Sequence, residues 1–303
     1  MSATATATVA AAYRGRRSRL GGLFHAEVVK LAHQWSTWLA IAAAAALFLA
    51  VVGWGGAGQA PVRALFRHDA EGWMRSVLPG VQMLFQYGSG VLLLVVAARS
   101  VGADYASGAM RVLLARGVGR VQLLAAKLLA LCCLAAVLLT VGAILVALYF
   151  GSVAVAAEGS LRAFAHVSPA LWQTLGLSAV SEVASMAAAI AVGTTAAVVG
   201  RSVAFGVGVA LAVYPADSLY TQWSPLLVSL THQRVWTDVT RVLLGPNLNA
   251  LSQHLRAGPP SGVPLPTPVG GAGALHATVV VAVWVAAMLV TSAAMLHRRD
   301  VLQ

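Results

Sequence analysis

Six long runs of apolar residues, separated by polar segments, form the basic pattern of this chain. The runs cover residues 38–52, 81–98, 123–150, 175–199, 203–220 and 274–296. With its flanking residues each run supplies about 20 helical residues, which is enough to cross a hydrocarbon layer roughly 30 Å thick. The pattern therefore predicts an all-α integral membrane protein with six transmembrane helices.

The composition supports this class. Of the 303 residues, 59% are hydrophobic and 10% are charged, and the mean hydropathy is +0.81, whereas soluble domains carry about 25% charged residues. The formal net charge is +11. In a membrane protein an excess of basic residues sets topology and attracts anionic lipid. No segment resembles a nucleic-acid-binding module, so we expect the lipid bilayer, and no nucleic acid, as a partner.

The basic residues also predict an orientation, because Lys and Arg next to spanning helices stay on the cytoplasmic side. With an inside amino terminus, 13 of the 20 Lys and Arg residues are cytoplasmic and 7 lie on the other side. The cytoplasmic set is Arg14, Arg16, Arg17, Arg19, Lys30, Arg99, Arg111, Arg116, Arg120, Lys127, Arg201, Arg298 and Arg299. We therefore expect a multi-pass protein of the cell membrane with both termini in the cytoplasm.

The segment before the first run has two parts. Residues 1–21 are of low complexity and basic, which predicts a disordered tail. Residues 22–35 carry apolar side chains at helical spacing, with Glu27 and Lys30 off that stripe. This spacing is typical of an interfacial helix that lies on the inner leaflet. We expect residues 22–303 to form one membrane domain.

The polar segment 99–122, between the second and third runs, is amphipathic. Met110, Leu113 and Leu114 share one side of a helix, and Asp104, Gly108 and Arg111 share another. Two interpretations are open: the segment forms a docking surface for a partner, or it packs as an ordinary loop on its own bundle.

The largest segment between runs, residues 221–273, is expected on the outer side. Its first half alternates apolar and polar residues and predicts short helices on or in the outer leaflet before the last span. Residues 258–273 are rich in Pro and Gly, which predicts a flexible link. Ser168 and Pro169 have the residue types of a helix cap and first turn at the start of the fourth span.

Motifs for catalysis are missing from the sequence. The two lysines, Lys30 and Lys127, follow Val29 and Ala126, so neither belongs to a phosphate-binding loop. There is no G-x-S-x-G motif, and the histidines lack the spacing of a helical zinc site. We expect no catalytic residue, no metal site and no cofactor in this chain.

Two carboxylates lie inside apolar runs, where they are costly. Glu182 is near the middle of the fourth run and Asp217 is near the outer end of the fifth. Both are candidates for a substrate path. For Glu182 the alternative is a structural hydrogen bond to Ser178, Ser181, Ser185 or a neighbouring helix. For Asp217 the alternative is a polar group at the membrane interface.

These segments together resemble the permease subunit of type 2 ABC transporters, the six-span exporter class, over nearly the whole chain. Three places carry the resemblance: the segment LFHAEVVKLAHQWSTW with Glu27, Lys30 and Leu31; the loop with Asp104, Gly108, Leu113, Leu114, Arg120 and Lys127; and GPNLNALSQHL, which begins at Gly245 and Pro246. The chain departs from the pattern at Ala109 and in the turn 116–119, where the family often has threonine and proline.

The resemblance implies a division of labour between subunits. A separate ATPase subunit, present in two copies, would bind ATP and Mg, and two permease copies would pair as a homodimer or a related heterodimer. Segment 99–122 would contain the coupling helix. The residues expected to contact the ATPase are Glu27, Lys30, Asp104, Gly108, Arg111, Arg116 and Arg120.

Two other functions stay open at the level of sequence. A proton-coupled secondary transporter would use Glu182 or Asp217 and would need no ATPase. A non-transporting membrane subunit of a larger assembly would use neither. No residue in the sequence selects a substrate.

Overall fold

The computed structural model describes residues 20–54, 58–255 and 266–298, and every regular element in these ranges is a helix. The elements are α2 (Leu20–Ala32), α3 (Trp35–Trp54), α4 (Ala60–His68), α5 (Ala70–Ala106), α6 (Ala109–Ala115), α7 (Arg120–Glu158), the short 3-10 helix η1 (Arg162–His166), α8 (Pro169–Gly200), α9 (Val203–Thr231), α10 (Val235–Thr240), α11 (Leu244–Leu255) and α12 (Ala274–Arg298). All but two residues of the predicted tail 1–21, and residues 258–265 of the predicted link, lie outside the described ranges.

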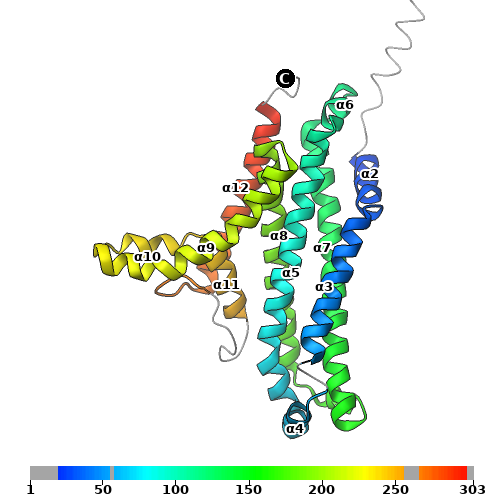
Figure 1. Cartoon of the computed structure of the whole chain (residues 1–303), viewed down its shortest axis with the longest axis vertical. Coiled ribbons are helices and arrows are strands. Elements are labelled where there is room, and N and C mark those ends of the chain that lie inside the picture. The colour runs from blue at the N-terminus through cyan, green and yellow to red at the C-terminus, as the bar shows by residue number, and fades with distance from the viewer. Residues whose placement is uncertain (1–19, 55–57, 256–265, 299–303) are drawn as a thin grey trace, which may run out of the picture.

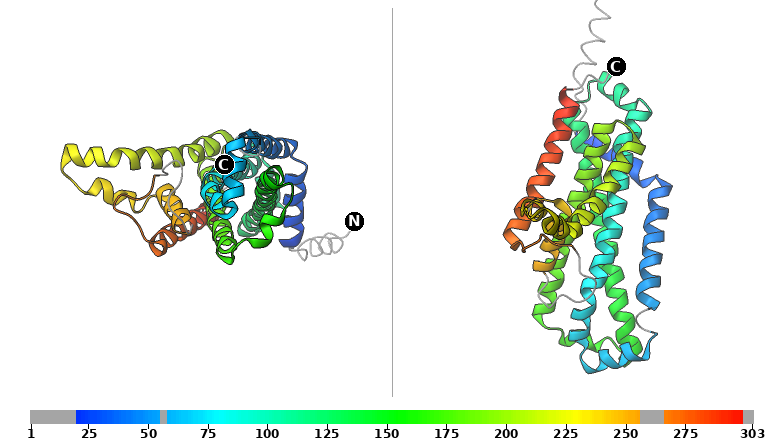
Figure 2. Two further views of the ribbon diagram at one scale, coloured as in Figure 1. Left: turned by 90° about the horizontal axis from the view of Figure 1, so that it is seen from below. Right: turned by 60° about the vertical axis from the view of Figure 1, so that its left-hand side comes forward.

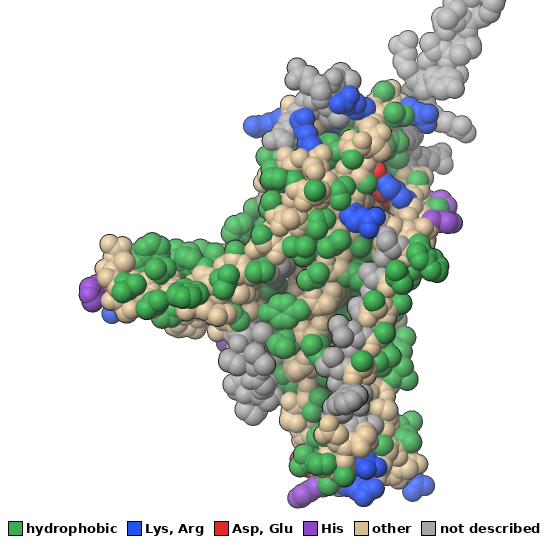
Figure 3. Space-filling model, viewed as in Figure 1, with side chains coloured by type: hydrophobic (Ala, Val, Ile, Leu, Met, Phe, Trp, Pro, Cys, Tyr) green, Lys and Arg blue, Asp and Glu red, His purple; other side chains and the backbone are tan. Residues whose placement is uncertain are grey.

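Five described helices, α5, α7, α8, α9 and α12, are long and apolar enough to cross a membrane. In α3 the apolar stretch is the shorter segment Thr37–Ala50. On the face shown in Figure 3, Lys and Arg side chains gather toward the two ends of the bundle and at the tip of a projecting arm, and the middle of the bundle carries none. The prediction of an all-α membrane protein is confirmed.

The long helices α3, α5, α7 and α8 run side by side as a bundle (Figure 1). Helices α2 and α6 lie at one end, together with the last turns of α12, and α4 lies at the other end. We call these the α6 end and the α4 end. Helix α5 packs most extensively against α8, and the two form the centre of the bundle.

Small residues allow this close packing. A Cβ atom added to Gly193 of α8 would lie 2.4 Å from the carbonyl oxygen of Leu94 in α5. One added to Gly206 of α9 would lie 2.9 Å from the Cα of Ala197 in α8. These glycines therefore pack helices within one bundle, as small residues do in membrane proteins.

The start of the bundle differs from the predicted interfacial segment 22–35. Helix α2 ends at Ala32 and α3 begins at Trp35, so Trp35 belongs to the first long helix. The turn between them is closed by the indole of Trp38, whose Nε1 donates to the carbonyl of Ala32 at 2.7 Å. Trp35 itself is 78% exposed, so it does not share the packed side of α2.

The polar segment 54–78, between the first two apolar runs, is mostly helical. Helix α4 and the start of α5 occupy it. The ring of Trp73 is buried against Phe66, Tyr149 and Phe150, whose ring centroids lie 5.5–5.9 Å from its own. The aromatic side chains give this polar-looking segment a core of its own.

The predicted start of the fourth span is confirmed. Ser168 is the residue before α8, and Pro169 is its first residue. The Ser168 side chain does not cap its own helix. Its backbone N–H and its hydroxyl donate to the Glu71 carboxylate at 3.0 and 2.5 Å, which ties the start of α8 to the start of α5.

The fifth apolar run is longer as a helix than the predicted 203–220. Helix α9 continues to Thr231, and with α10 it forms an arm that projects sideways from the bundle (Figures 1 and 2). Proline at 225 cannot donate to the carbonyl of Thr221. The hydroxyl of Ser224 donates to that carbonyl at 3.0 Å instead, so the helix passes the proline without leaving this acceptor unpaired.

Candidate functional site

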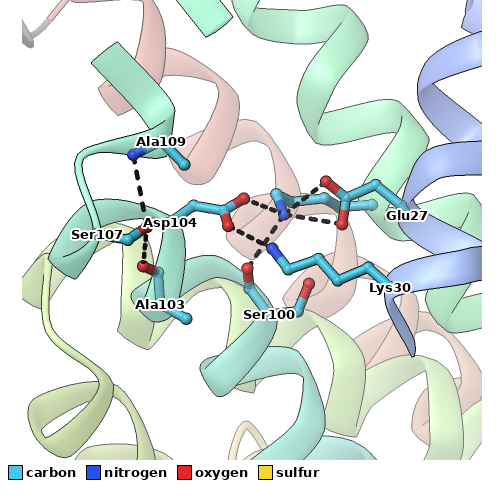
Figure 4. A network of polar contacts seen from close by, with 8 residues as sticks. Glu27, Lys30, Ser100, Ala103, Asp104, Ser107 and Ala109 are labelled. Atoms are coloured by element: carbon cyan, nitrogen blue, oxygen red, sulfur yellow. Dashed lines mark hydrogen bonds and ion pairs between the residues drawn. The ribbon is translucent and has the colours of Figure 1, made fainter. Parts of the chain in front are cut away.

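A network of four charged side chains joins α2, α5 and α7 near the α6 end (Figure 4). The ammonium of Lys127 lies 3.0 Å from both carboxylate oxygens of Glu27 and 2.5 Å from Oδ2 of Asp104, and it donates to the carbonyl of Ser100 at 3.1 Å. Lys30 pairs with the other oxygen of Asp104. Each helix thus contributes at least one charge to a shared cluster.

Burial makes the network important for the fold. Lys127 is 2% exposed, Asp104 4% and Glu27 7%, while the side chain of Lys30 is 45% exposed. The two ammonium groups balance the two carboxylates, as buried charges require. Removing one partner would leave an uncompensated charge among packed helices.

Helix α6 lies over this network with its apolar side facing the bundle. Met110 is buried, and Leu113 and Leu114 pack partly buried against the core formed by α5, α7, α8 and the last turns of α12. Arg111 in α6 and Arg116, the residue that follows the helix, are both exposed. The apolar side of α6 is therefore used inside the chain, and the two arginines face outward.

Glycine at position 108 makes the turn into α6. Its φ is +70°, in the left-handed region, and no atom would contact an added Cβ within 4 Å. The hydroxyl of Ser107 bonds the carbonyl of Ala103 at 2.8 Å just before this turn. Backbone conformation, and not a lack of space, selects glycine here.

We expect Gly108→Ala to lower the free energy of unfolding by about 1–2 kcal/mol, because a Cβ is strained at this φ. Gly108→Asn should lose less, since asparagine tolerates the left-handed region. Thermal unfolding of the detergent-purified protein measures both. Equal losses for Ala and Asn would contradict the backbone explanation.

The loop after α6 is tied to the last helix. Arg120 is the first residue of α7, and its Nη1 donates to the carbonyls of Leu296 and His297 at 3.0 and 2.7 Å. These carbonyls belong to the carboxyl end of α12, where a cation is favoured by the helix dipole. Arg120 therefore connects the α6 loop to α12.

The predicted contact residues are thus divided by the structure. Glu27, Lys30 and Asp104 meet in the network, Arg111 and Arg116 face outward, and Arg120 binds α12. Lys127, which is not in the predicted contact set, is the centre of the network. The signal that could have found it is a lysine within an apolar run one turn after the run begins.

Glu182 lies at the seam between α5 and α8. It is 2% exposed, and the hydroxyl of Ser89 in α5 donates to its Oε1 at 2.6 Å. Beside this pair, the amide nitrogen of Gln82 donates to the hydroxyl of Ser181 at 2.7 Å. The alternative of a hydrogen bond to a neighbouring helix is therefore realised in the structure. Gln82 and Ser89 were not singled out from the sequence.

A cavity of about 590 Å³ adjoins this seam. It lies between α5, α7 and α8, is lined almost entirely by apolar side chains, and includes Glu182 in its wall. Its size is within the range of small-molecule sites, roughly 300–1,000 Å³.

Asp217 lies apart from this cavity and has a different setting. Its Oδ2 accepts from the backbone N–H of Gly245 at 2.9 Å, at the first turn of α11. Carboxylates stabilise this end of a helix by hydrogen bonding and by the helix dipole. Asp217 thus holds α11 against α9.

The comparison with known families decides the class. Residues 23–214, more than half of the chain, match the family model described as ABC-2 family transporter protein. The chain belongs to this family. The ABC-2 match begins in α2 and ends within α9, and it contains the charged network, α6, the cavity and Glu182.

The remainder of this ABC-2 protein lies outside the matched residues. It includes α11, where the segment beginning at Gly245 and Pro246 is buried against neighbouring helices. A comparison with curated protein sequences finds no match. Within the described ranges, no group of three or more His, Cys, Asp or Glu side chains is placed to hold a metal ion. By its family and its long apolar helices, the chain is a multi-pass membrane component of a transporter.

Proposed function

We propose that the chain is the transmembrane subunit of an ATP-driven ABC exporter that works with a separate ATPase subunit. In this proposal α3 is the sixth span, and two permease copies pair with two ATPase copies that bind ATP and Mg. The α6 end faces the cytoplasm, α2 is the interfacial helix and α6 is the coupling helix. The protein resides in the cell membrane with both termini inside.

The arrangement of α6 over the charged network carries this proposal. Arg111 and Arg116 offer an outward basic surface to a partner, while Met110 anchors the other side of α6 to the bundle. Directly below, Lys127 joins α2, α5 and α7. A displacement of α6 by ATPase closure would therefore move several spans together, as packed elements shift as units.

The role of the predicted contact residues follows from their burial. Arg111 and Arg116 would contact the ATPase directly, with charge complementarity. Glu27 and Asp104 would act from inside, by holding the helices that receive the force. Gly108 and Arg120 would set the position of α6, through the turn before it and the tie to α12.

Affinity purification of the tagged protein in mild detergent tests the proposal. We expect a stoichiometric soluble ATPase to co-purify. If none is captured and vesicles instead show proton-driven transport, the chain is a proton-coupled secondary transporter. If neither result is obtained, it is an assembly subunit.

Charge reversal tests the contact surface. In Arg111→Glu/Arg116→Glu the amount of captured ATPase should fall about tenfold, which corresponds to 1.4 kcal/mol of binding free energy. The matched control is Arg162→Glu/Arg234→Glu, which reverses two exposed arginines elsewhere in the chain and should retain the ATPase. Equal capture by both double variants would contradict a contact through α6.

A further inference from the structure

The cavity between α5, α7 and α8 has an unusual distribution of polar atoms. Its only polar side chains among the described lining residues are Gln82, Ser178 and Glu182, all from the α5–α8 seam. Each is more than nine-tenths buried. In the described part of the chain, Gln82 Oε1, Ser178 Oγ and Glu182 Oε2 have no hydrogen-bond partner. The remaining wall is apolar or glycine.

Unpaired buried oxygens of this kind are costly, and the carboxylate is the most costly of the three. All three oxygens accept hydrogen bonds, and two of them, those of Gln82 and of ionised Glu182, only accept. A ligand that relieves the cost must therefore present hydrogen-bond donors, and a positive charge would also balance Glu182.

The rest of the wall selects an apolar body for the same ligand. Phe85, Val146, Phe150 and Trp172 are among the lining residues. No described lining residue is Lys or Arg, so nothing there would neutralise a phosphate. A phospholipid headgroup fits this wall poorly, because its anionic group would be buried without a partner.

The cavity also opens toward the outer surface of the bundle. Its lining residues Ala143, Ala147 and Trp172 are exposed on the outer surface of α7 and α8. In a membrane that surface faces lipid, so an apolar ligand can enter sideways from the bilayer. The hydroxyl of Ser89, which does not line the cavity, donates to the carboxylate of Glu182.

We propose that this cavity binds a hydrophobic amine, with its protonated nitrogen on Glu182, Ser178 and Gln82 and its apolar body between α7 and α8. The inference rests on the proposed function, because it names the substrate class of the exporter. The site lies within a single protomer, so it does not require a second copy.

Photolabelling of the full chain in phosphatidylglycerol nanodiscs tests this site. The probes are three diazirine-bearing chains of equal length that end in an amine, an alcohol or a carboxylate. The amine should label α7 and α8 peptides at least tenfold more than the other two. Equal labelling by all three probes would show that the cavity takes apolar chains or water only, and would overturn the assignment.

Two pairs of variants sharpen the test. Glu182→Gln keeps an acceptor for Ser89 but removes the charge, and Ala147→Trp fills the cavity from its exposed side. Each should reduce amine labelling about tenfold. Glu158→Gln and Ala136→Trp change an exposed carboxylate and an exposed alanine of α7 outside the cavity, and labelling should be unchanged. If Glu182→Gln and Ala147→Trp both label like the wild type, the site is wrong.

A final set of nanodiscs distinguishes a free amine from an aminophospholipid as the ligand. Nanodiscs that contain phosphatidylethanolamine should leave amine labelling unchanged, and competition would overturn the assignment of a phosphate-free ligand. The experiment needs no ATPase. A chain that captures an ATPase but fails to prefer the amine therefore contradicts this inference alone and leaves the proposed function standing.

Discussion

Lys127→Met is expected to lower the free energy of unfolding by about 3–5 kcal/mol, the usual cost of removing one partner from a buried ion pair. Methionine has a similar shape, so packing changes little. The substitution leaves the buried carboxylates of Glu27 and Asp104 with Lys30 as the one remaining cation of the network. Because the network joins α2, α5 and α7, the loss should also weaken ATPase-driven transport.

The same substitution at Lys30 is the matched control. Lys30 pairs with the same Asp104, but its side chain is 45% exposed. An exposed ion pair contributes about 0–1 kcal/mol, and Asp104 keeps Lys127 as a partner in this variant. Lys30→Met should therefore shift the midpoint of thermal unfolding far less. If the two variants unfold at the same temperature in detergent, burial does not set the strength of this network.

Gly193→Ala is expected to destabilise the protein by about 1–3 kcal/mol, the usual cost of overpacking. The added Cβ would lie 2.4 Å from the Leu94 carbonyl oxygen and 3.1 Å from the Cβ of Ala97. The first of these atoms is backbone, so it cannot rotate away. Helices α5 and α8 would have to separate at the centre of the bundle.

Gly176→Ala on the same helix should have the opposite sign. Gly176 is exposed and has no atom within 4 Å of an added Cβ. In an open helical position alanine is favoured over glycine by up to about 1 kcal/mol. Thermal unfolding of the two variants compares them directly. A stabilising Gly193→Ala would show that α5 and α8 are not packed as closely as described.

Long apolar runs were sufficient to predict the helical class, since about 20 apolar residues in a row have few other solutions. The ends of the helices were harder to predict. At the α4 end, Trp73 lies in a polar stretch of sequence but is buried by aromatic partners from α4 and α7. The length of α9 was missed because the hydroxyl of Ser224, three residues from Thr221, replaces a hydrogen bond that Pro225 removes.

The candidate site was predicted residue by residue but not as an arrangement. Glu27, Asp104 and Lys127 are far apart in sequence, and nothing in their local spacing shows that they meet. For Glu182 the missing information was the partner helix: Gln82, Gln86 and Ser89 repeat at helical spacing within an apolar run, which is a signal for a polar seam. Asp217 was placed near the outer surface, and its link to α11 required the fold.

Helix α5 is unbroken from Ala70 to Ala106, about 55 Å at 1.5 Å per residue. Asp104 stands near one end of this helix, and Gln82, one of the residues that line the cavity, lies on the far side of the helix midpoint. Pro79, the one proline inside the helix, lies beyond Gln82. In the proposed exporter, a tilt imposed at Asp104 would reach Gln82 in the cavity wall before it reaches Pro79, so α5 would transmit movement from the α6 end to the cavity.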